Sequence, residues 1–274
     1  MRFDITMLPI NHFKRALRSG SAQLGVWSTI PSPYISELIA GAGYDWVLID
    51  SEHTPTDVPL VLNQLQAVSG AIAKPGTAPS HPIVRPAWND PVLIKRYLDV
   101  GAQTLLLPFV QNAEEARAAV SATRYAPHGI RGMGGSTRAS NFGRIPDYVD
   151  RAADELCVLV QVETMQALDQ IERIADVEGV DGIFIGPADL SASMGFPGKS
   201  RHPDVTRAID DAIRRIRACG KAPGIMMTDE ERARECLALG AQFVAVAIDT
   251  VLLRDGLDIT LAQYRDCPQR TSAY

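Results

Sequence analysis

The sequence predicts a (β/α)8 barrel, formed by a single domain, and three observations support this fold class. The chain has 274 residues, of which 46% are hydrophobic, which suits one large α/β domain. Eight short apolar runs recur along the chain, and they are continuous rather than alternating, as expected for parallel strands buried on both faces. Helical patterns separate the runs, and eight such units over about 250 residues are typical of this barrel. The rival fold is a doubly wound open sheet, but no GxGxxG motif follows the first run.

The expected strands are, in chain order, residues 23–27, 46–50, 82–85, 104–108, 157–163, 182–186, 222–226 and 243–249. The clearest helical patterns span residues 32–42, 91–100, 112–123 and 228–239. Asp90 precedes a proline, and Asn112 precedes two glutamates, as is common where helices begin. The last of these patterns opens Thr-Asp-Glu-Glu, which is capping-box chemistry, and meets Gly240 at its end.

No composition shift divides the chain, so we expect one barrel domain over residues 1–274, with residues 1–20 as an N-terminal helical extension. Two segments interrupt the alternation. Residues 70–81 are rich in Pro, Gly and Ala and are interpreted as a surface loop. Residues 129–144 are rich in Gly, Arg and Ser, and are interpreted as a mobile lid, an intersubunit contact or a solvated loop.

Composition excludes several classes of function. With 27 basic and 32 acidic residues the net charge is −5, and no basic block is present, which argues against nucleic-acid binding. The apolar runs are far shorter than the roughly 20 residues of a membrane-spanning helix. The N-terminal residues lack the apolar block of a secretory signal, and the four cysteines lie far apart. We therefore expect a cytoplasmic enzyme with reduced thiols and no membrane partner.

Polar residues follow the predicted strands at their carboxyl ends, where the chemistry of such barrels lies. The set comprises Asp50, Glu52, His53, Arg85, Gln161, Glu163, Asp189 and Asp249. Glu163 and Asp189 end neighbouring strands, so they could together hold one hard divalent cation. Two alternatives stay open: a general acid/base pair, or a structural role in which Asp189 caps a turn and Glu163 pairs with an arginine.

Three further features at the strand ends have a functional and a structural interpretation. His53 could be a base that titrates near neutral pH, or a capping or partly buried histidine. Arg85 could stabilise an enolate or carboxylate oxygen, or form a structural ion pair with a barrel carboxylate. The Gly-Pro turn before Ala188 could direct the backbone N–H groups of Ala188 and Asp189 toward an anion.

The positions of the lysines limit which reaction mechanisms the chain could use. None of the five lysines ends a predicted strand, so a Schiff-base mechanism has no candidate residue. The chain also lacks a nucleophile elbow, a Walker loop, an HExxH motif and a zinc cysteine cluster. Electrophilic assistance would therefore have to come from a metal ion.

Seven motifs in one order then resemble a known family. They are WVLIDSEHTP, VRPAWNDP, LLLPFVQNAEEA, YAPHGIRGMG, LVQVET, VEGVDGIFIGPADLSASMG and GKAPGIM. From about Leu24 to Leu253 the chain resembles the HpcH/HpaI family of metal-dependent pyruvate aldolases. The resemblance implies a barrel of the phosphoenolpyruvate/pyruvate type, use of Mg²⁺, Mn²⁺ or Co²⁺, and a homohexamer. It also implies reversible cleavage of 4-hydroxy-2-oxo acids to a 2-oxo acid and an aldehyde, as in aromatic catabolism.

The same resemblance implies a role for each site residue. Glu163 and Asp189 would be the metal ligands. Arg85 would stabilise the enolate oxygen, and His53 would be the base, made more basic by Asp99.

Substrate would be held by Gln161, by the backbone of Ala188 and at Asp189.

The chain departs from the family pattern at two places. The segment 70–81 is longer than the usual connection of the family, and Met226 stands where a leucine is common. Both differences could change the aldehyde preference.

Two other functions stay open. One is a lyase of CoA thioesters of the citryl or malyl type, for which Arg131, Arg138 and Arg144 are the only basic cluster that could meet the CoA phosphates. The other is a non-catalytic barrel that binds small oxo acids. The full set of His53, Arg85, Asp99, Glu163 and Asp189 argues against it, because binding alone requires no base.

Overall fold

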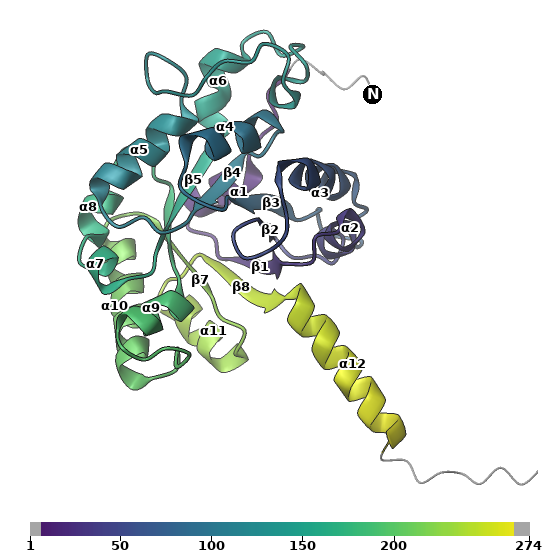
Figure 1. Ribbon diagram of the computed structural model, residues 1–274, viewed down its shortest axis with the longest axis vertical. Coiled ribbons are helices and arrows are strands. Elements are labelled where there is room, and N and C mark those ends of the chain that lie inside the picture. The colour runs from purple at the N-terminus through teal and green to yellow at the C-terminus, as the bar shows by residue number, and fades with distance from the viewer. Residues whose placement is uncertain (1–6, 266–274) are drawn as a thin grey trace, which may run out of the picture.

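The computed structural model describes residues 7–265 and confirms the predicted (β/α)8 barrel (Figure 1). Eight parallel strands form a closed barrel in chain order, so every strand pairs with its sequence neighbours and β8 pairs with β1. The strands are β1 Gln23–Ser28, β2 Trp46–Asp50, β3 His81–Arg85, β4 Thr104–Leu107, β5 Cys157–Val162, β6 Gly182–Ile185, β7 Ala222–Met226 and β8 Phe243–Ile248.

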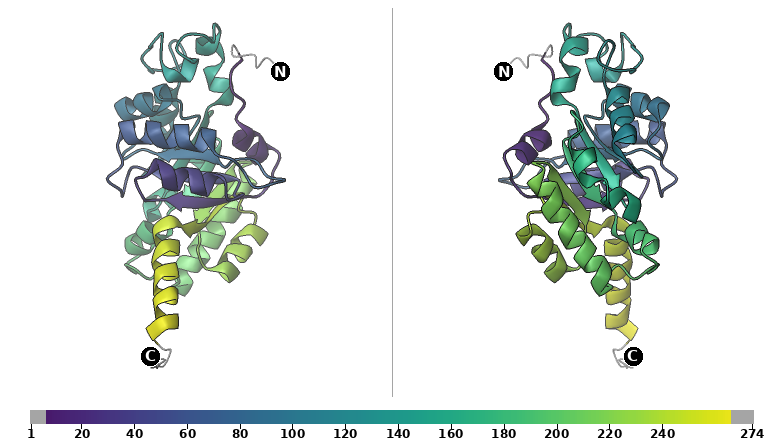
Figure 2. Two further views of the ribbon diagram at one scale, coloured as in Figure 1. Left: turned by 90° about the vertical axis from the view of Figure 1, so that its right-hand side faces the viewer. Right: turned by 90° about the vertical axis from the view of Figure 1, so that its left-hand side faces the viewer.

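Most of the helices surround the barrel on the outside (Figure 2). They are α1 His12–Arg18, α2 Pro33–Ala40, α3 Val58–Gly70, α4 Pro91–Asp99, α5 Ala113–Thr123, α6 Tyr148–Glu155, α7 Met165–Leu168, α8 Ile171–Ala175, α9 Pro187–Ser193, α10 Pro203–Ala218, α11 Glu230–Ala238 and α12 Asp249–Arg265, with a 3₁₀ turn η1 Arg138–Ser140. Within the predicted N-terminal extension, the described residues form α1, and residues 1–6 lie outside the described range.

The helix starts follow local capping chemistry. Asp90 and Asn112 accept backbone N–H groups of the first turns of α4 and α5, as their positions predict. The predicted start at residue 228 is wrong, because Asp229 is the residue whose side chain caps α11, through the N–H of Arg232. An Asp at this position satisfies an orphan N–H and adds a negative charge at the positive helix end, so the helix begins later.

The barrel interior is filled by aromatic side chains that glycines make room for. A Cβ at Gly25 would lie 2.1 Å from the Trp46 ring, and one at Gly224 would lie 2.2 Å from the Phe243 ring. Phe13 of α1 packs against both rings with centroid distances of 6.3 and 6.0 Å, so α1 covers the amino-terminal end of the barrel. Full burial of such a side chain contributes about 1.5–3 kcal/mol, and the strands that carry the site are held by this packing.

Segments 70–81 and 129–144 both lie on the amino-terminal side of the strands. The first connects α3 to the start of β3, and the second lies between α5 and α6, which precedes β5. Arg138 of the second segment donates a hydrogen bond to the Val100 carbonyl at 2.8 Å, beside the end of α4. Within one chain, segment 129–144 therefore does not cover the carboxyl-terminal mouth as a lid. Its interpretation as an intersubunit contact stays a prediction.

Helix α12 projects away from the barrel (Figures 1 and 2). It begins at Asp249, whose carboxylate accepts hydrogen bonds from Ser28 Oγ and from the backbone N–H groups of Thr29 and Ile30. Asp249, a candidate strand-end carboxylate, thus joins the end of β8 to β1. Farther along, the helix exposes Leu252, Leu253, Leu257, Ile259, Leu261 and Tyr264.

In residues 7–265, no helix has both the length and the apolar character needed to cross a membrane.

Candidate active site

Arg85 is fixed at the barrel mouth by two carboxylates. It ends β3 opposite Asp50 of β2, and its Nε and Nη2 donate to the Asp50 carboxylate at 2.9 and 2.8 Å. Its Nη1 lies 2.7 Å from Glu52 Oε2, and its Cζ lies 4.7 Å from the centroid of the Trp27 ring. Burial alone would raise the pKa of Asp50, but the hydrogen bonds and charge of Arg85 outweigh it and hold that pKa below its ordinary value. The structural ion pair considered for Arg85 is therefore present, and it holds the guanidinium rigidly beside the cavity.

Glu163 is a buried carboxylate without a cation. It follows β5 with 2% of its surface exposed, and no Lys, Arg or His among residues 7–265 forms an ion pair with it. Its Oε1 accepts the backbone N–H of Phe109 at 3.0 Å, and its Oε2 accepts Nε2 of Gln161 at 2.6 Å. Burial raises the pKa of Glu163 to about 7, and the nearby charges of Asp189 and Glu52 add to this effect.

Asp189 reaches the same site from β6. The strand passes through Gly186 and Pro187 into α9, and Asp189 lies exposed in the first turn of this helix. A Cβ at Gly186 would lie 2.7 Å from Glu163 Oε2, so only glycine leaves room for that carboxylate. The alternative pairing of Glu163 with an arginine is not formed within residues 7–265.

The donor set fits a hard divalent cation. Glu163 and Asp189 carry carboxylate oxygens, the type of ligand that such a cation prefers, and within residues 7–265 no cation compensates the charge of Glu163. Residues 7–265 contain no group of three or more His, Cys, Asp or Glu side chains placed to hold a metal by themselves. Mg²⁺ is commonly bound by one or two carboxylates, with water and substrate oxygens completing its shell. In addition, Gln161 Oε1 is buried without a hydrogen-bond partner in the described chain, which leaves an acceptor at the site for a bound molecule.

A cavity of about 300 Å³ at the mouth brings the candidate residues together. Its walls include the polar residues predicted from the strand ends, and apolar side chains from several strands. The lining comprises Trp27, His53, Arg85, Gln161, Glu163, Phe184, Gly186, Pro187, Ala188, Asp189, Ser200, Arg201, Met226, Met227, Thr228, Asp229 and Ile248. Six of the seven predicted site residues therefore face one cavity.

His53 lies on the mouth side with 69% of its side chain exposed, and its Nε2 is 3.9 Å from Glu52 Oε1. Asp99, the seventh residue, ends α4, which runs back from the mouth to the opposite end of the barrel. There its carboxylate lies 2.8 Å from Arg131 Nη2. One chain therefore does not bring Asp99 to His53, and the carboxylate beside His53 is Glu52.

The sequence interpretation assigned no role to Asp50, Glu52 or Phe109. The two acids could have been found, because Asp50 ends and Glu52 follows the strand next to the one that ends in Arg85, and a buried arginine needs partners. Phe109 acts through its backbone N–H, so no residue type marks its position.

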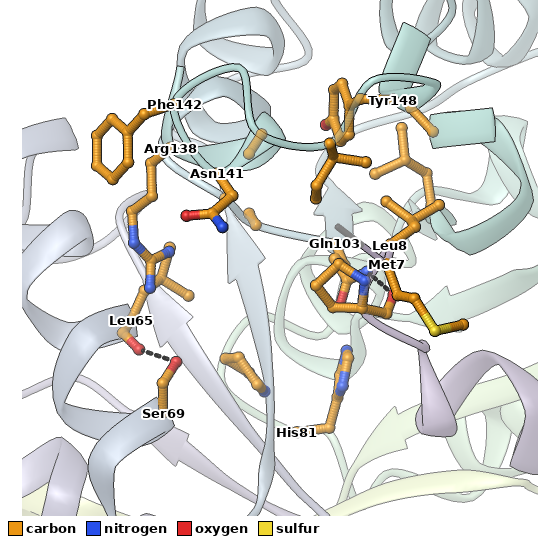
Figure 3. A pocket seen from close by; sticks show the side chains of 18 residues that line it. Met7, Leu8, Leu65, Ser69, His81, Gln103, Arg138, Asn141, Phe142 and Tyr148 are labelled. Atoms are coloured by element: carbon orange, nitrogen blue, oxygen red, sulfur yellow. Dashed lines mark hydrogen bonds between the residues drawn. The ribbon is translucent and has the colours of Figure 1, made fainter. Parts of the chain in front are cut away.

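A second cavity, of about 480 Å³, lies at the amino-terminal end of the barrel (Figure 3). Its lining includes His81, Gln103 and Arg138 but no carboxylate side chain. Burial, with a smaller contribution from His12, lowers the pKa of His81 to about 3, so this imidazole is neutral at physiological pH. This cavity at the amino-terminal end thus offers neither an acid/base pair nor metal ligands.

A (β/α)8 barrel with paired acids, a guanidinium and an imidazole at its mouth fits a lyase acting on small oxo acids. The sequence profile described as HpcH/HpaI aldolase/citrate lyase matches residues 23–256, and the chain belongs to this family. The resemblance seen in the motifs is thereby confirmed.

Named relatives and a solved structure agree with this family. The chain is 57% identical over 255 residues to a 4-hydroxy-2-oxo-heptane-1,7-dioate aldolase of Klebsiella pneumoniae, covering 93% of this chain and 94% of the relative. It is 54% identical over 257 residues to a pyruvate aldolase of Rhizobium etli, covering 94% and 98%. A crystal structure of an HpcH/HpaI aldolase/citrate lyase family protein from Burkholderia cenocepacia superposes with a TM-score of 0.88 at 38% identity, covering 93% of this chain and all of that one (100%).

Proposed function

We propose that the chain is a divalent-metal-dependent aldolase, a carbon–carbon lyase that reversibly cleaves 4-hydroxy-2-oxo acids to pyruvate, or a related 2-oxo acid, and an aldehyde. The observation that carries the proposal is the buried, uncompensated carboxylate of Glu163 beside Asp189 at the barrel mouth. The names of the relatives in Klebsiella and Rhizobium support the same reaction.

Glu163 and Asp189 would hold the metal ion. When bound, the ion supplies Lewis acidity to the C2 carbonyl of the substrate. Gln161 can accept a hydrogen bond from the substrate through its unpartnered Oε1, and Ala188 lines the same cavity and would hold substrate through its backbone. The guanidinium of Arg85, held by Asp50 and Glu52, stabilises the negative charge that develops on the enolate oxygen.

His53 acts as the base. It removes the proton of the C4 hydroxyl, the C3–C4 bond breaks, and its electron pair enters the enolate while the aldehyde leaves. The exposed ring can reach substrate in the cavity, and Glu52 lies near enough to orient it. In the reverse direction His53 returns the proton to the new hydroxyl oxygen.

Chelation tests this assignment directly. We expect EDTA to abolish pyruvate release from a 4-hydroxy-2-oxo acid, and Mg²⁺, Mn²⁺ or Co²⁺ to restore it. Sodium borohydride should trap no pyruvate on the chain, because no lysine of residues 7–265 is among those lining the mouth cavity. Full turnover after chelation, together with a borohydride-trapped adduct, would replace the metal mechanism with a Schiff-base mechanism.

The CoA-thioester alternative finds little support at the mouth. Arg131 is buried against Asp99, and Arg138 donates to the Val100 carbonyl, both at the opposite end of the barrel. These arginines cannot meet CoA phosphates at the mouth of their own chain. Metal-dependent pyruvate release would also exclude a barrel that only binds oxo acids.

We further propose a homo-oligomer, with the hexamer of the family as the expected assembly. The apolar side chains that α12 exposes, Leu257 and Ile259 among them, support association through this helix. Light scattering should give several times the 29.7 kDa of one chain, and Leu257→Asp should lower that mass.

A cytoplasmic location agrees with the free thiols of Cys157, Cys219 and Cys236, while Cys267 lies outside the described residues.

A further inference from the structure

Phe109 has an unusual backbone conformation for its residue type. It follows β4 with φ of 55°, in the left-handed region where a Cβ crowds the backbone. In residues 7–265 only Asn141 and Phe142 share a positive φ without being glycine, and both lie in segment 129–144 at the other end of the barrel. A bulky residue is held in this conformation only if its surroundings determine it, so its contacts identify what it does.

The conformation directs two successive N–H groups at β5. The N–H of Phe109 donates to Glu163 Oε1 at 3.0 Å, and the N–H of Val110 donates to the Gln161 carbonyl at 3.0 Å. Gln161 Nε2 donates to the other oxygen of Glu163 at 2.6 Å. Each oxygen of this carboxylate thus has one donor from the chain, which leaves each of them a lone pair for a cation.

A side-chain contact holds Phe109 in place. Its ring stacks on Trp88, from the loop after β3, with centroids 5.5 Å apart and planes 29° apart. As whole residues, Phe109 and Trp88 are 39% and 52% exposed, so neither lies in the core. The stack is therefore a side-chain contact that supports the left-handed turn, in addition to its two backbone hydrogen bonds.

We propose that Phe109 is a positioning residue: its strained backbone, clamped by Trp88, fixes the carboxylate of Glu163 for the metal ion. Neither ring has to touch the ion or the substrate for this role. The inference rests on the proposed function, in which Glu163 is a metal ligand.

A pair of substitutions at one position separates backbone from side chain. Both Phe109→Ala and Phe109→Gly remove the stack and keep the N–H, but only glycine adopts a positive φ without strain. We expect Phe109→Ala to weaken Mn²⁺ binding about tenfold, at the lower end of what losing a partner of a metal ligand costs. Phe109→Gly should stay within about threefold of the wild-type dissociation constant, measured by isothermal titration calorimetry.

Variants at Trp88 and Phe142 complete the test. Trp88→Ala should weaken Mn²⁺ binding as Phe109→Ala does, and Trp88→Phe should restore it, because a stacked ring remains. Phe142→Ala is the matched control, since this phenylalanine is also left-handed and exposed but lies far from the mouth. Thermal unfolding of each apo variant shows whether the fold is intact.

The outcomes are distinct. Wild-type Mn²⁺ affinity in Phe109→Ala would overturn the positioning role, and so would equal losses in the alanine and glycine variants, because the side chain alone would then matter. Failure of the wild-type chain to bind Mn²⁺ would instead overturn the proposed function, and this inference with it. An equal loss in Phe142→Ala would show a general effect of strain and would also contradict the proposal.

Discussion

At the mouth of the barrel Glu163 is buried without a cation, whereas at the opposite end Arg131 is buried against a carboxylate. The side chain of Arg131 is 0% exposed, its Nη2 lies 2.8 Å from Asp99 Oδ1, and its Cζ lies 4.5 Å from the centroid of the Tyr125 ring. From the described part of the chain, Glu163 receives two hydrogen-bond donors, and burial raises its pKa to about 7.

The comparison distinguishes a charge whose partner lies in the chain, that of Arg131, from a charge for which we propose an external partner, that of Glu163. Burying a charge is costly unless a partner compensates it, and the chain itself provides that partner for Arg131. For Glu163 it provides the opposite, because Asp189 and Glu52 add negative charge nearby. Such a group is stabilised either by taking up a proton or by an external cation. That a divalent metal ion supplies this charge to Glu163 is the central claim about the mouth.

Glu163→Gln should produce the largest loss. Removing one of two ligands should abolish stoichiometric Mn²⁺ binding and lower kcat by about 10³-fold or more, the rate equivalent of several kcal/mol. Calorimetry and a coupled pyruvate assay measure the two effects. Glu178→Gln, an exposed acid at the other end, is the control and should change neither. Near-normal turnover in Glu163→Gln would remove the metal from the mechanism.

His53→Ala should slow aldol cleavage by about 10²–10⁴-fold, the usual contribution of a general base. Exchange of the pyruvate methyl protons should slow much less, because this step does not involve the C4 hydroxyl. Both rates can be followed by NMR in deuterated buffer. His128→Ala changes an exposed histidine at the other end and should leave both rates as they are. Unchanged cleavage without the imidazole would eliminate His53 as the base.

Arg131→Met tests the other half of the comparison, that the ion pair of Arg131 stabilises the fold and does not affect the metal site. It leaves Asp99 without its cation and removes the contact with Tyr125, so the free energy of unfolding should fall by about 2–3 kcal/mol. This loss is smaller than the roughly 3–5 kcal/mol that breaking a fully buried ion pair costs, because the side chain of Asp99 is 25% exposed. Urea unfolding measures this loss, while Mn²⁺ affinity of the folded variant should stay unchanged. A selective loss of metal affinity would show that the two ends are not independent.

The stability of the apo protein and its Mn²⁺ affinity should both depend on pH through the carboxyl of Glu163. Because the pKa of Glu163 is about 7 when folded and 4.5 in its ordinary state, the folded chain is penalised as pH rises from 4.5 to 7. Glu163→Gln should therefore raise the apo melting temperature above pH 7 and have no such effect below pH 4.5. In the wild-type chain, Mn²⁺ affinity should be constant above pH 7 and fall roughly tenfold per unit below it. A pH-independent affinity between pH 5 and 8 would contradict the raised pKa.

Much of the fold could be predicted because a closed parallel barrel repeats one unit, and each buried strand leaves a continuous apolar run. The positions of Glu163 and Asp189 followed from the same regularity, since strand ends converge on one mouth. Asp99 is different, because the family resemblance alone implied its role beside His53, and within one chain the helix that carries it ends beside Arg131, away from the mouth. Phe109 could not be predicted, because a hydrogen bond from the backbone leaves no trace in residue type.

Crystals grown with Mn²⁺ and a 2-oxo acid, with data collected at the manganese absorption edge, test the central claim most directly. The account predicts one anomalous peak at the mouth, within bonding distance of carboxylate oxygens of both Glu163 and Asp189. A peak elsewhere in the barrel, or Glu163 and Asp189 turned away from any ion, would contradict it.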